Sequence, residues 1–332
     1  MKTFATLFSG GGGVDVGLMA AGLAPLWAVE YDAAIAGVYE RNIGHAPIVA
    51  DVRDVDYAAL VPVDWLHASP VCTRASVANP SAGEAELDIE MAQAVVRSIQ
   101  AIRPQVFTLE NVWQYRDFAA FRLILNALGE AGYMYDFEHI NCADFGVPQT
   151  RKRLLLRAVH GALLPALPQP VPWIGWYAAI EDLIPTLPES KLAPWQLARL
   201  PEELREALLI NSENAGQEWG GIKIATAPAM TIGTTSIPRA VLVPGILNGE
   251  SERMTIRNGD APSPTVTVCQ RDIRAAFPCR VVTMTIRCLA RFQSVPDWYQ
   301  LPKKRTLAAK IVGNMVPSLL MQRIAEQMEV TA

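Results

Sequence analysis

Short apolar runs and stretches of helical spacing alternate through the first 160 residues. The apolar runs are bounded by Gly, Pro or Asp and predict buried strands. They are TFATLF (3–8), PLWAVE (25–30), PIVAD (47–51), DWLHAS (64–69), VFTLEN (106–111) and RLLLRAV (153–159). Helical spacing covers DVGLMAAG (15–22) and residues 32–42, 88–102 and 117–131. This alternation predicts an α/β fold with a doubly wound, mostly parallel sheet covered on both faces.

The pattern changes after residue 160. MYDFEHIN (134–141) is expected to add an antiparallel strand at the end of the sheet, and the chain from 161 to about 280 is then rich in Pro, Gly and Thr. There, residues 195–209 look helical, and TAPAMTIG (226–233) and DAPSPTVT (260–267) look like short strands after a turn. A last helix over 317–328 has Pro in its favoured first turn and should pack back on the first domain.

We therefore expect three segments. Residues 1–160 form the main domain, 161–280 a smaller, irregular β-rich domain, and 281–332 a C-terminal segment that returns to the main domain. At 332 residues the chain is long enough for one large core and a smaller one.

Composition narrows the class of protein. Apolar residues make up 51% and charged residues 19%, as in ordinary globular chains. No run reaches the roughly 18 apolar residues that a membrane span needs, so no membrane partner is expected. The N-terminus lacks the long apolar core and cleavage site of a signal peptide, which predicts a cytoplasmic protein.

The cysteines and the net charge exclude further classes. The five cysteines are scattered, without a CxxC pair, which argues against a disulfide framework and against a thiolate zinc site. A net charge of −4 means that any surface for nucleic acid must be local. The candidates are residues 151–157, 271–280 and 303–310.

A glycine run follows the first predicted strand. FSGGGG (8–13) sits between a strand and a helix, where glycines allow a tight turn and a close approach of the backbone to a ligand. Glu30 and Asp51 end the second and third predicted strands, and a carboxylate there can accept bonds from ribose hydroxyls. A tight turn alone explains an isolated glycine run. With two spaced acids, a site for a nucleoside is the better interpretation. The pattern alone does not distinguish a dinucleotide from adenosylmethionine as the ligand.

Reactive side chains follow the fourth and fifth predicted strands. Cys72 begins a loop at the carboxyl end of the fourth predicted strand. A lone cysteine is more often a buried, inert core residue, but the position beside the glycine run favours a nucleophile here. Glu110 follows the apolar run VFTL, where an acid is costly unless it serves a ligand. Asn111 beside it also suits a helix N-cap.

A basic cluster precedes the last strand of the main domain. Arg151 and Arg153 are two apart and so point the same way on an extended chain, where two guanidinium groups can address one ligand. For an isolated RKR, a solvated basic edge would be the default interpretation.

In this order, the motifs resemble the cytosine-5 DNA methyltransferase family over nearly the whole chain. LFSGGGGVDVG is similar to the cofactor loop of the family, and LENV to its catalytic glutamate motif. NCADFGVPQTRKRLLL resembles the segment that ends in Q-x-R-x-R. MTIRCLARFQSVPDWYQLP and IVGNMVPSLL resemble the two closing blocks, the second of which is G-N-x-V-P.

The cysteine loop departs from the family pattern of Pro-Pro-Cys-Gln followed by Phe-Ser. Here the sequence is Pro70-Val71-Cys72-Thr73, then Ala75-Ser76. Asn79 replaces the glycine that usually closes the loop, and Cys288 stands where a later block usually has an acid. These changes bear on the flexibility, rate and substrate contacts of the loop, not on the nucleophile.

The resemblance implies a Rossmann-like methyltransferase that uses S-adenosylmethionine and no metal. It implies transfer to C5 of a flipped-out cytosine through a Cys72 adduct at C6, with Glu110, Arg151 and Arg153 as the other catalytic residues. Ser76 and Gln149 are the expected substrate contacts. The expected cofactor contacts are Phe8, Gly10, Gly11, Gly12, Gly13, Glu30, Tyr31, Asp51, Val52, Pro70, Asn314 and Val316.

The expected partner is double-stranded DNA, read by residues 161–280 as a target-recognition domain. Base-reading or phosphate-contacting side chains there are Gln217, Arg253, Arg257, Gln270, Arg271 and Arg274. A monomer is expected, and a cognate restriction endonuclease is a candidate partner. The alternatives are a methyltransferase that acts on tRNA, a non-catalytic DNA-binding relative and, more remotely, an NAD-dependent enzyme. The size of the second domain favours duplex DNA.

Overall fold

A sheet of seven strands forms the centre of the main domain. The computed structural model describes residues 1–70, 83–192, 208–210, 222–231, 238–242 and 280–329. In sheet order the strands are β3 (Ile48–Val49), β2 (Ala24–Glu30), β1 (Thr3–Leu7), β4 (Trp65–Ala68), β5 (Val106–Asn111), β7 (Lys152–His160) and β6 (Tyr133–Asn141). The strands β3, β2, β1, β4 and β5 pair in parallel, so the predicted mostly parallel α/β sheet is confirmed.

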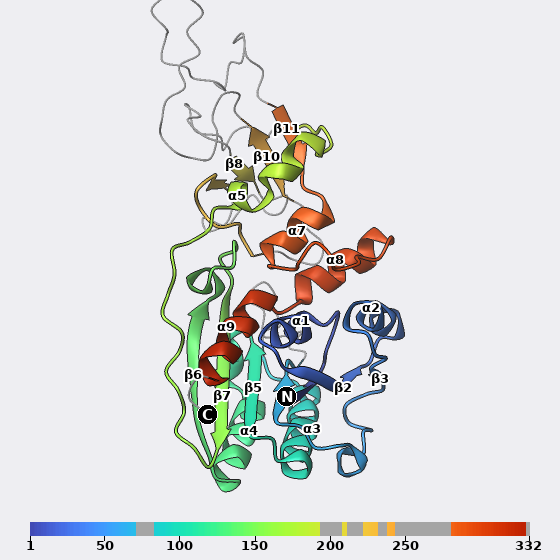
Figure 1. The fold of residues 1–332 in the computed structure, drawn as a ribbon, viewed down its shortest axis with the longest axis vertical. Coiled ribbons are helices and arrows are strands. Elements are labelled where there is room, and N and C mark those ends of the chain that lie inside the picture. Colours follow the sequence, from blue (N-terminus) through green and yellow to red (C-terminus); the bar gives the residue numbers. More distant parts are fainter. Residues whose placement is uncertain (71–82, 193–207, 211–221, 232–237, 243–279, 330–332) are drawn as a thin grey trace, which may run out of the picture.

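Helices connect these strands and cover both faces of the sheet (Figure 1). Their bounds are α1 (Gly13–Ala20), α2 (Ala33–Ile43), α3 (Glu86–Ile102) and α4 (Ala119–Glu130). The short 3-10 helices are η1 (Tyr57–Ala59), η2 (Trp113–Asp117), η3 (Cys142–Phe145) and η4 (Glu181–Thr186). The helices α3 and α4 share a core with one face of the sheet, while α1 and α2 pack on the other. No helix in the described ranges is long and apolar enough to span a membrane.

The antiparallel part of the sheet differs from the prediction. MYDFEHIN does form the last strand, β6, but the strand that runs against the rest is β7, which pairs antiparallel with both β5 and β6. Burial explains the order. Residues 154–159 of β7 are all buried, so this strand takes the interior position. The strand β6 is mostly exposed and takes the edge.

A second, smaller sheet lies above the first (Figure 1). Its antiparallel strands are β11 (Arg280–Thr283), β10 (Arg239–Leu242), β8 (Leu208–Ile210) and β9 (Ile222–Ile224). The smaller sheet shares one apolar core with the helices α5 (Trp176–Ile180), α7 (Ile286–Phe292) and α8 (Arg305–Asn314), and this core extends to α2. The smaller β-rich unit is therefore present, while the predicted boundaries at 160 and 280 stay a prediction.

Three predicted elements of this region need comment. The end of the expected helix over 195–209 is wrong, because residues 208 and 209 belong to β8 and pair with β10. Residues 226–231 of TAPAMTIG form a turn and an isolated bridge at Ala229 rather than a strand, because this backbone pairs with Gln149 alone. The segment DAPSPTVT lies outside the described residues.

That bridge joins the two sheets. The main-chain nitrogen of Ala229 donates to Pro148 O at 2.9 Å, and the nitrogen of Thr150 donates to Ala229 O at 2.8 Å. The hydroxyl of Thr231 adds a bond to Thr150 O at 2.7 Å. The chain just before β7 is thus fixed to the smaller sheet by main-chain hydrogen bonds.

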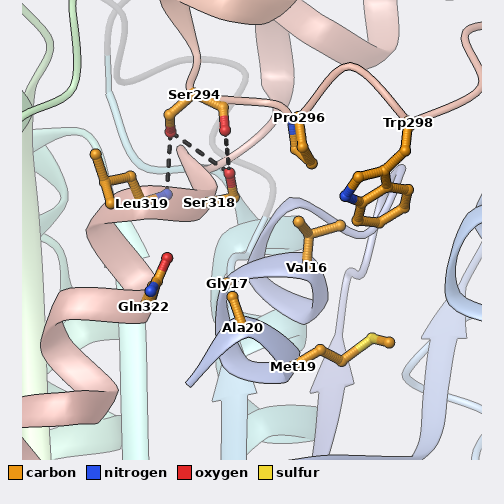
Figure 2. A pocket seen from close by; sticks show the side chains of 10 residues that line it. All are labelled: Val16, Gly17, Met19, Ala20, Ser294, Pro296, Trp298, Ser318, Leu319 and Gln322. Atoms are coloured by element: carbon orange, nitrogen blue, oxygen red, sulfur yellow. Dashed lines mark hydrogen bonds between the residues drawn. The ribbon is translucent and has the colours of Figure 1, made fainter. Parts of the chain in front are cut away.

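The last helix, α9 (Ser318–Glu329), packs against α1, as predicted (Figure 1). The two helices approach so closely that a methyl group on Gly17 would lie 2.3 Å from Ser318 O. Figure 2 shows how the start of α9 is tied down, with Ser318 Oγ donating to Ser294 O at 2.5 Å and Leu319 N to Ser294 Oγ at 3.0 Å. Glycine at position 17 is therefore a packing requirement.

We predict that Gly17→Ala lowers the free energy of unfolding by about 1–3 kcal/mol, because the new methyl group meets backbone that cannot yield. Gly37→Ala in α2 is the matched control, since the nearest atom that the new methyl group would meet is the end of the flexible Arg41 side chain, at 3.9 Å. That variant should gain roughly 0.5–1 kcal/mol from helix propensity. Urea denaturation of both variants measures the difference. Equal stabilisation by both changes would contradict the close helix contact.

A buried acid lies under the glycine run. Asp15 of α1 accepts bonds at Oδ1 from Thr6 Oγ1 at 3.0 Å and from Tyr39 Oη at 2.7 Å. Its Oδ2 is buried without a hydrogen-bond partner among the described residues. Burial raises the pKa of Asp15 from 3.8 to about 6. The ionised carboxyl is therefore costly to the fold at neutral pH.

We predict that Asp15→Asn stabilises the fold at pH 7–8 by up to about 3 kcal/mol, the equivalent of a shift of about two pKa units. The native pKa lies above the ordinary value of 3.8, so the stability from the protonated carboxyl is complete below pH 3.8 and is lost as pH rises through about 6. Urea midpoints at pH 4, 6 and 8 should fall with pH more steeply in wild type than in the variant. Parallel curves would contradict the assignment.

Candidate active site

The glycine run lies at the edge of the sheet where the parallel strands end. It follows β1 directly and leads into α1, with Gly12 as the N-cap residue. Phe8, Gly10 and Gly12 have positive φ angles of 58°, 55° and 83°. Glycine adopts this conformation without strain, so the residue types at 10 and 12 follow from the turn itself.

Glu30 closes this loop from the neighbouring strand. One carboxylate oxygen accepts from Gly10 N at 2.8 Å, and the other accepts from Asp32 N at 2.8 Å. A carboxylate oxygen can accept a further bond, so Glu30 retains capacity for hydroxyl groups of a ligand. Ser9 Oγ beside it is buried and has no hydrogen-bond partner among the described residues. A polar ligand at this edge would satisfy it.

The other two glycines serve packing. A methyl group on Gly11 would lie 2.4 Å from Ile311 Cγ2 and 2.7 Å from Tyr299 Oη, and one on Gly13 would lie 2.4 Å from Val316 O. The four glycines therefore have two purposes, a turn at the strand edge and close contact with the C-terminal segment. Sequence reasoning had assigned all four to a ligand.

The remaining predicted cofactor residues gather around this edge with different exposures. Tyr31 is 77% exposed just after β2, and Asn314 is exposed at the end of α8. Val52 and Val316 are buried in the core. Asp51 lies two residues beyond β3, not at its end as predicted, because β3 stops at Val49.

Asp51 already has a strong partner. Arg53 donates to its carboxylate from the main-chain nitrogen, from Nε and from Nη2, at 2.9, 3.0 and 2.8 Å. Bonding to the Arg53 side chain lowers the pKa of Asp51, so the carboxylate stays ionised. It can act toward a ligand as an acceptor and not as a donor.

Glu110, Arg151 and Arg153 form a buried cluster of charges. Glu110 ends β5, and its Oε1 lies 2.9 Å from Arg153 Nε and 4.0 Å from Arg151 Nη2. Arg151 is 3% exposed and donates from Nη1 to Gly313 O at 3.2 Å. Burial and then the charge of Arg153 lower the pKa of Arg151 to about 10. The structure thus brings together three residues that the sequence selected from two separate motifs.

This cluster contains unused hydrogen-bonding capacity. Glu110 Oε1, Arg151 Nε and both amide atoms of Gln149 are buried without hydrogen-bond partners in the described part of the chain. The ion pair with Arg153 lacks the geometry of a hydrogen bond at that oxygen. Unsatisfied buried groups cost free energy, so their concentration here suits a polar ligand that pairs with them.

The chain that leads to Cys72 is anchored at its last described residue. Asn111 Nδ2 donates to Pro70 O at 3.1 Å, and Asn111 Oδ1 accepts from Val112 N at 2.8 Å. Asn111 therefore ties the end of β5 to the start of the cysteine loop, while Val112 takes the N-cap position of η2. Cys72 and Ser76 lie outside the described residues.

A buried polar chain also runs toward this loop. Trp65 Nε1 donates to Thr108 Oγ1 at 3.0 Å, and the ring nitrogens of His67 bond Thr108 Oγ1 and Ser69 Oγ, each at 2.8 Å. Burial lowers the pKa of His67 to about 3, so the ring is neutral. Ser69 directly precedes Pro70, and the strand end before the loop is therefore fixed from two sides.

The two described cysteines are unlike a nucleophile. Cys142 and Cys288 are both buried, and burial raises the pKa of the Cys142 thiol to about 12 and that of Cys288 in the same direction. Both are thiols rather than thiolates at neutral pH. Within the described ranges no group of His, Cys, Asp and Glu could hold a metal ion.

Sequence reasoning missed the residues that hold the site in place. The sequence suggests Asn111 as a helix cap, whereas its side chain donates to Pro70 O. Tyr299 donates to Gly11 O at 2.5 Å across 288 positions of sequence. An aromatic within an apolar block gives no signal of such a contact, because the partner is a main-chain carbonyl far away in the sequence.

Comparison with known proteins agrees with this arrangement. The family model for C-5 cytosine-specific DNA methylase matches residues 2–330. The type II methyltransferase M.XorII of Xanthomonas oryzae pv. oryzae is 25% identical over 97% of this chain and 83% of its own. M.NlaX of Neisseria lactamica, also a type II methyltransferase, is 27% identical over 97% of this chain and 95% of its own.

A solved structure supports the fold. A prophage-encoded E. coli protein, named as a DNA modification methyltransferase, superposes with a TM-score of 0.67 at 14% identity and covers 100% of this chain and 99% of its own. The family model extends over nearly the whole sequence and over every motif of the site. This chain belongs to the C-5 cytosine-specific DNA methylase family and is a DNA (cytosine-5-)-methyltransferase.

Proposed function

We propose that the protein transfers a methyl group from S-adenosylmethionine to C5 of a flipped-out cytosine in duplex DNA, through a covalent adduct of Cys72 at C6. The observation that carries the proposal is the buried cluster of Glu110, Arg151 and Arg153, beside the Asn111 clamp on the cysteine loop. An acid and guanidinium groups lie at the end of β5, and Asn111 there bonds Pro70, two residues before Cys72 in the sequence, which suits this chemistry.

The glycine edge fits the nucleoside part of S-adenosylmethionine. Glu30 is suited to accept from ribose hydroxyls, and the buried Ser9 hydroxyl is available for a further polar contact. The ionised Asp51 is suited to accept from an amino group, and exposed Tyr31 presents a ring beside the edge. We assign Phe8, Gly10, Val52, Pro70, Asn314 and Val316 to the same site. When bound, S-adenosylmethionine supplies an electrophilic methyl group.

Cys72 would act first. Cytosine C5 is a poor nucleophile, and addition of the Cys72 thiolate to C6 converts the ring to an enamine that is nucleophilic at C5. Glu110 is suited to hold a proton shared with N3 of the base, since its Oε1 is ion-paired with Arg153 but makes no hydrogen bond to the described residues. After transfer, a base removes the C5 proton and Cys72 leaves.

The two arginines would fix the charge that develops on the ring. Arg153 is suited to hold O2 of the base, while the buried Arg151, which donates to Gly313 O of the C-terminal segment, supports Glu110. Gln149, whose amide atoms have no hydrogen-bond partner among the described residues, and Ser76 are assigned to substrate contact. A cytosine stacked in a duplex cannot reach this edge, so flipping is part of the proposal, at a cost of a few kcal/mol.

The smaller sheet and the chain around it are proposed to read the DNA. Gln217, Arg253, Arg257, Gln270, Arg271 and Arg274, which we assign to this reading, lie outside the described residues. The type II names of the relatives support a modification enzyme that acts beside a cognate restriction endonuclease, and we propose that it is monomeric and cytoplasmic.

We predict that Cys72→Ser abolishes methyl transfer and leaves S-adenosylmethionine affinity within about twofold of wild type, because a hydroxyl is a far weaker nucleophile than a thiolate. Tritium transfer to duplex DNA and calorimetric binding measure the two quantities. Cys288→Ala, at a buried thiol, is the matched control and should keep its activity. Full activity of Cys72→Ser would refute the nucleophile.

The nature of the substrate has a separate test. Tritium transfer to duplex DNA should exceed transfer to tRNA by at least about a hundredfold, since specific sites exceed unspecific binding by such factors. A covalent complex should also form on duplex DNA that contains 5-fluorocytosine. Preferential labelling of tRNA would overturn the choice of DNA, and absence of any labelling or trapping would favour a non-catalytic relative.

A further inference from the structure

Tyr299 connects the C-terminal segment to the centre of the glycine run. It lies between α7 and α8, is 0% exposed, and its hydroxyl donates to Gly11 O at 2.5 Å. The fit is close, because a methyl group on Gly11 would lie 2.7 Å from this oxygen. The contact is thus a directed bond to one main-chain carbonyl.

The backbone of Tyr299 is held on both sides. Arg287 of α7 donates to Tyr299 O from Nη2 at 2.7 Å, and Tyr299 N donates to Pro296 O at 3.1 Å. The next residue, Gln300, exchanges two bonds with the Asn42 side chain of α2, at 2.7 and 3.2 Å. The phenol therefore extends from a fixed base, and its hydroxyl cannot follow the loop if the loop moves.

The hydroxyl is also a permanent donor. Burial, followed by the nearby charge of Asp15, raises the pKa of Tyr299 above its ordinary value. Gly11 lies directly after Gly10, whose N–H binds Glu30 at 2.8 Å. The peptide that carries the Gly11 carbonyl also carries the Gly12 N–H, which donates to Ser9 O at 3.0 Å, and the Ser9 carbonyl shares its peptide with the Gly10 N–H. Holding the Gly11 carbonyl therefore restrains both peptides and keeps the Gly10 N–H directed at Glu30.

We propose that Tyr299 is a positioning residue for the S-adenosylmethionine site: its hydroxyl fixes the Gly11 carbonyl and so presets the loop that holds Glu30. The inference rests on the proposed function, since it assigns a ligand to that loop. Without this bond, glycines 10–12 have wider conformational freedom, and binding must then order them at a cost in affinity.

The test is Tyr299→Phe, which removes one oxygen and keeps the ring. Calorimetry with S-adenosylhomocysteine should give a dissociation constant about 3- to 10-fold above wild type, the range expected for one net hydrogen bond. Affinity for duplex DNA in the absence of cofactor should be unchanged. An unchanged constant for S-adenosylhomocysteine would overturn the role.

Tyr133→Phe is the matched control. Tyr133 is also a buried tyrosine, 5% exposed, and its hydroxyl donates to Pro104 O at 2.6 Å at the start of β6. Both variants lose one buried bond to a carbonyl and should melt at lower temperatures. The cofactor affinity should fall in Tyr299→Phe alone, and an equal fall in both variants would show general destabilisation and overturn the inference.

A second variant covers the case in which Tyr299→Phe does not fold. Asn42→Ala removes both bonds to Gln300 and leaves the hydroxyl in place, so the constant for S-adenosylhomocysteine should rise by about twofold. An unchanged constant would count against the positioning role. If wild type itself fails to bind S-adenosylhomocysteine, the cofactor proposal fails and this role with it. If wild type binds it normally and the variants bind it equally well, only the positioning role fails.

Discussion

The close contact between the glycine run and the C-terminal segment is the constraint on which the rest of the site depends. Gly11, Gly13 and Gly17 meet Tyr299, Val316 and Ser318 at distances that exclude a side chain. The contact joins the two ends of the sequence and completes one face of the sheet. It also places Gly313 where its carbonyl accepts from Arg151, so the charge cluster depends on the same junction.

The charge cluster is held by its environment more than by its own attraction. A buried ion pair gains little over apolar packing unless its remaining polar groups are hydrogen-bonded, and in the described part of the chain several of them are not. The fold accepts this cost because β5, β7 and the C-terminal segment fix the three side chains in advance. Preorganised charge in a buried setting stabilises a transition state without further rearrangement.

Much of the main domain could be predicted from the sequence, because its strands are short apolar runs and its helices have clear spacing. The order of the motifs also led to Glu110, Arg151 and Arg153, which do meet. The direction of β7 was not predictable, since periodicity indicates a strand but not its neighbours. The packing role of Gly13 and the bonds of Asn111 and Tyr299 depend on residues far away in sequence, which no local pattern reveals.

The bridge between the two sheets has a consequence for how such enzymes diversify. Its bonds between Pro148, Thr150 and Ala229 join main-chain groups. Every residue has a main-chain carbonyl that can accept such a bond, and every residue except proline has an N–H that can donate one. Mutations in the smaller unit can therefore accumulate without loosening its attachment beside the charge cluster. On the proposed function, a lineage can alter the DNA sequence that the smaller unit reads while the charge cluster next to β7 stays as it is.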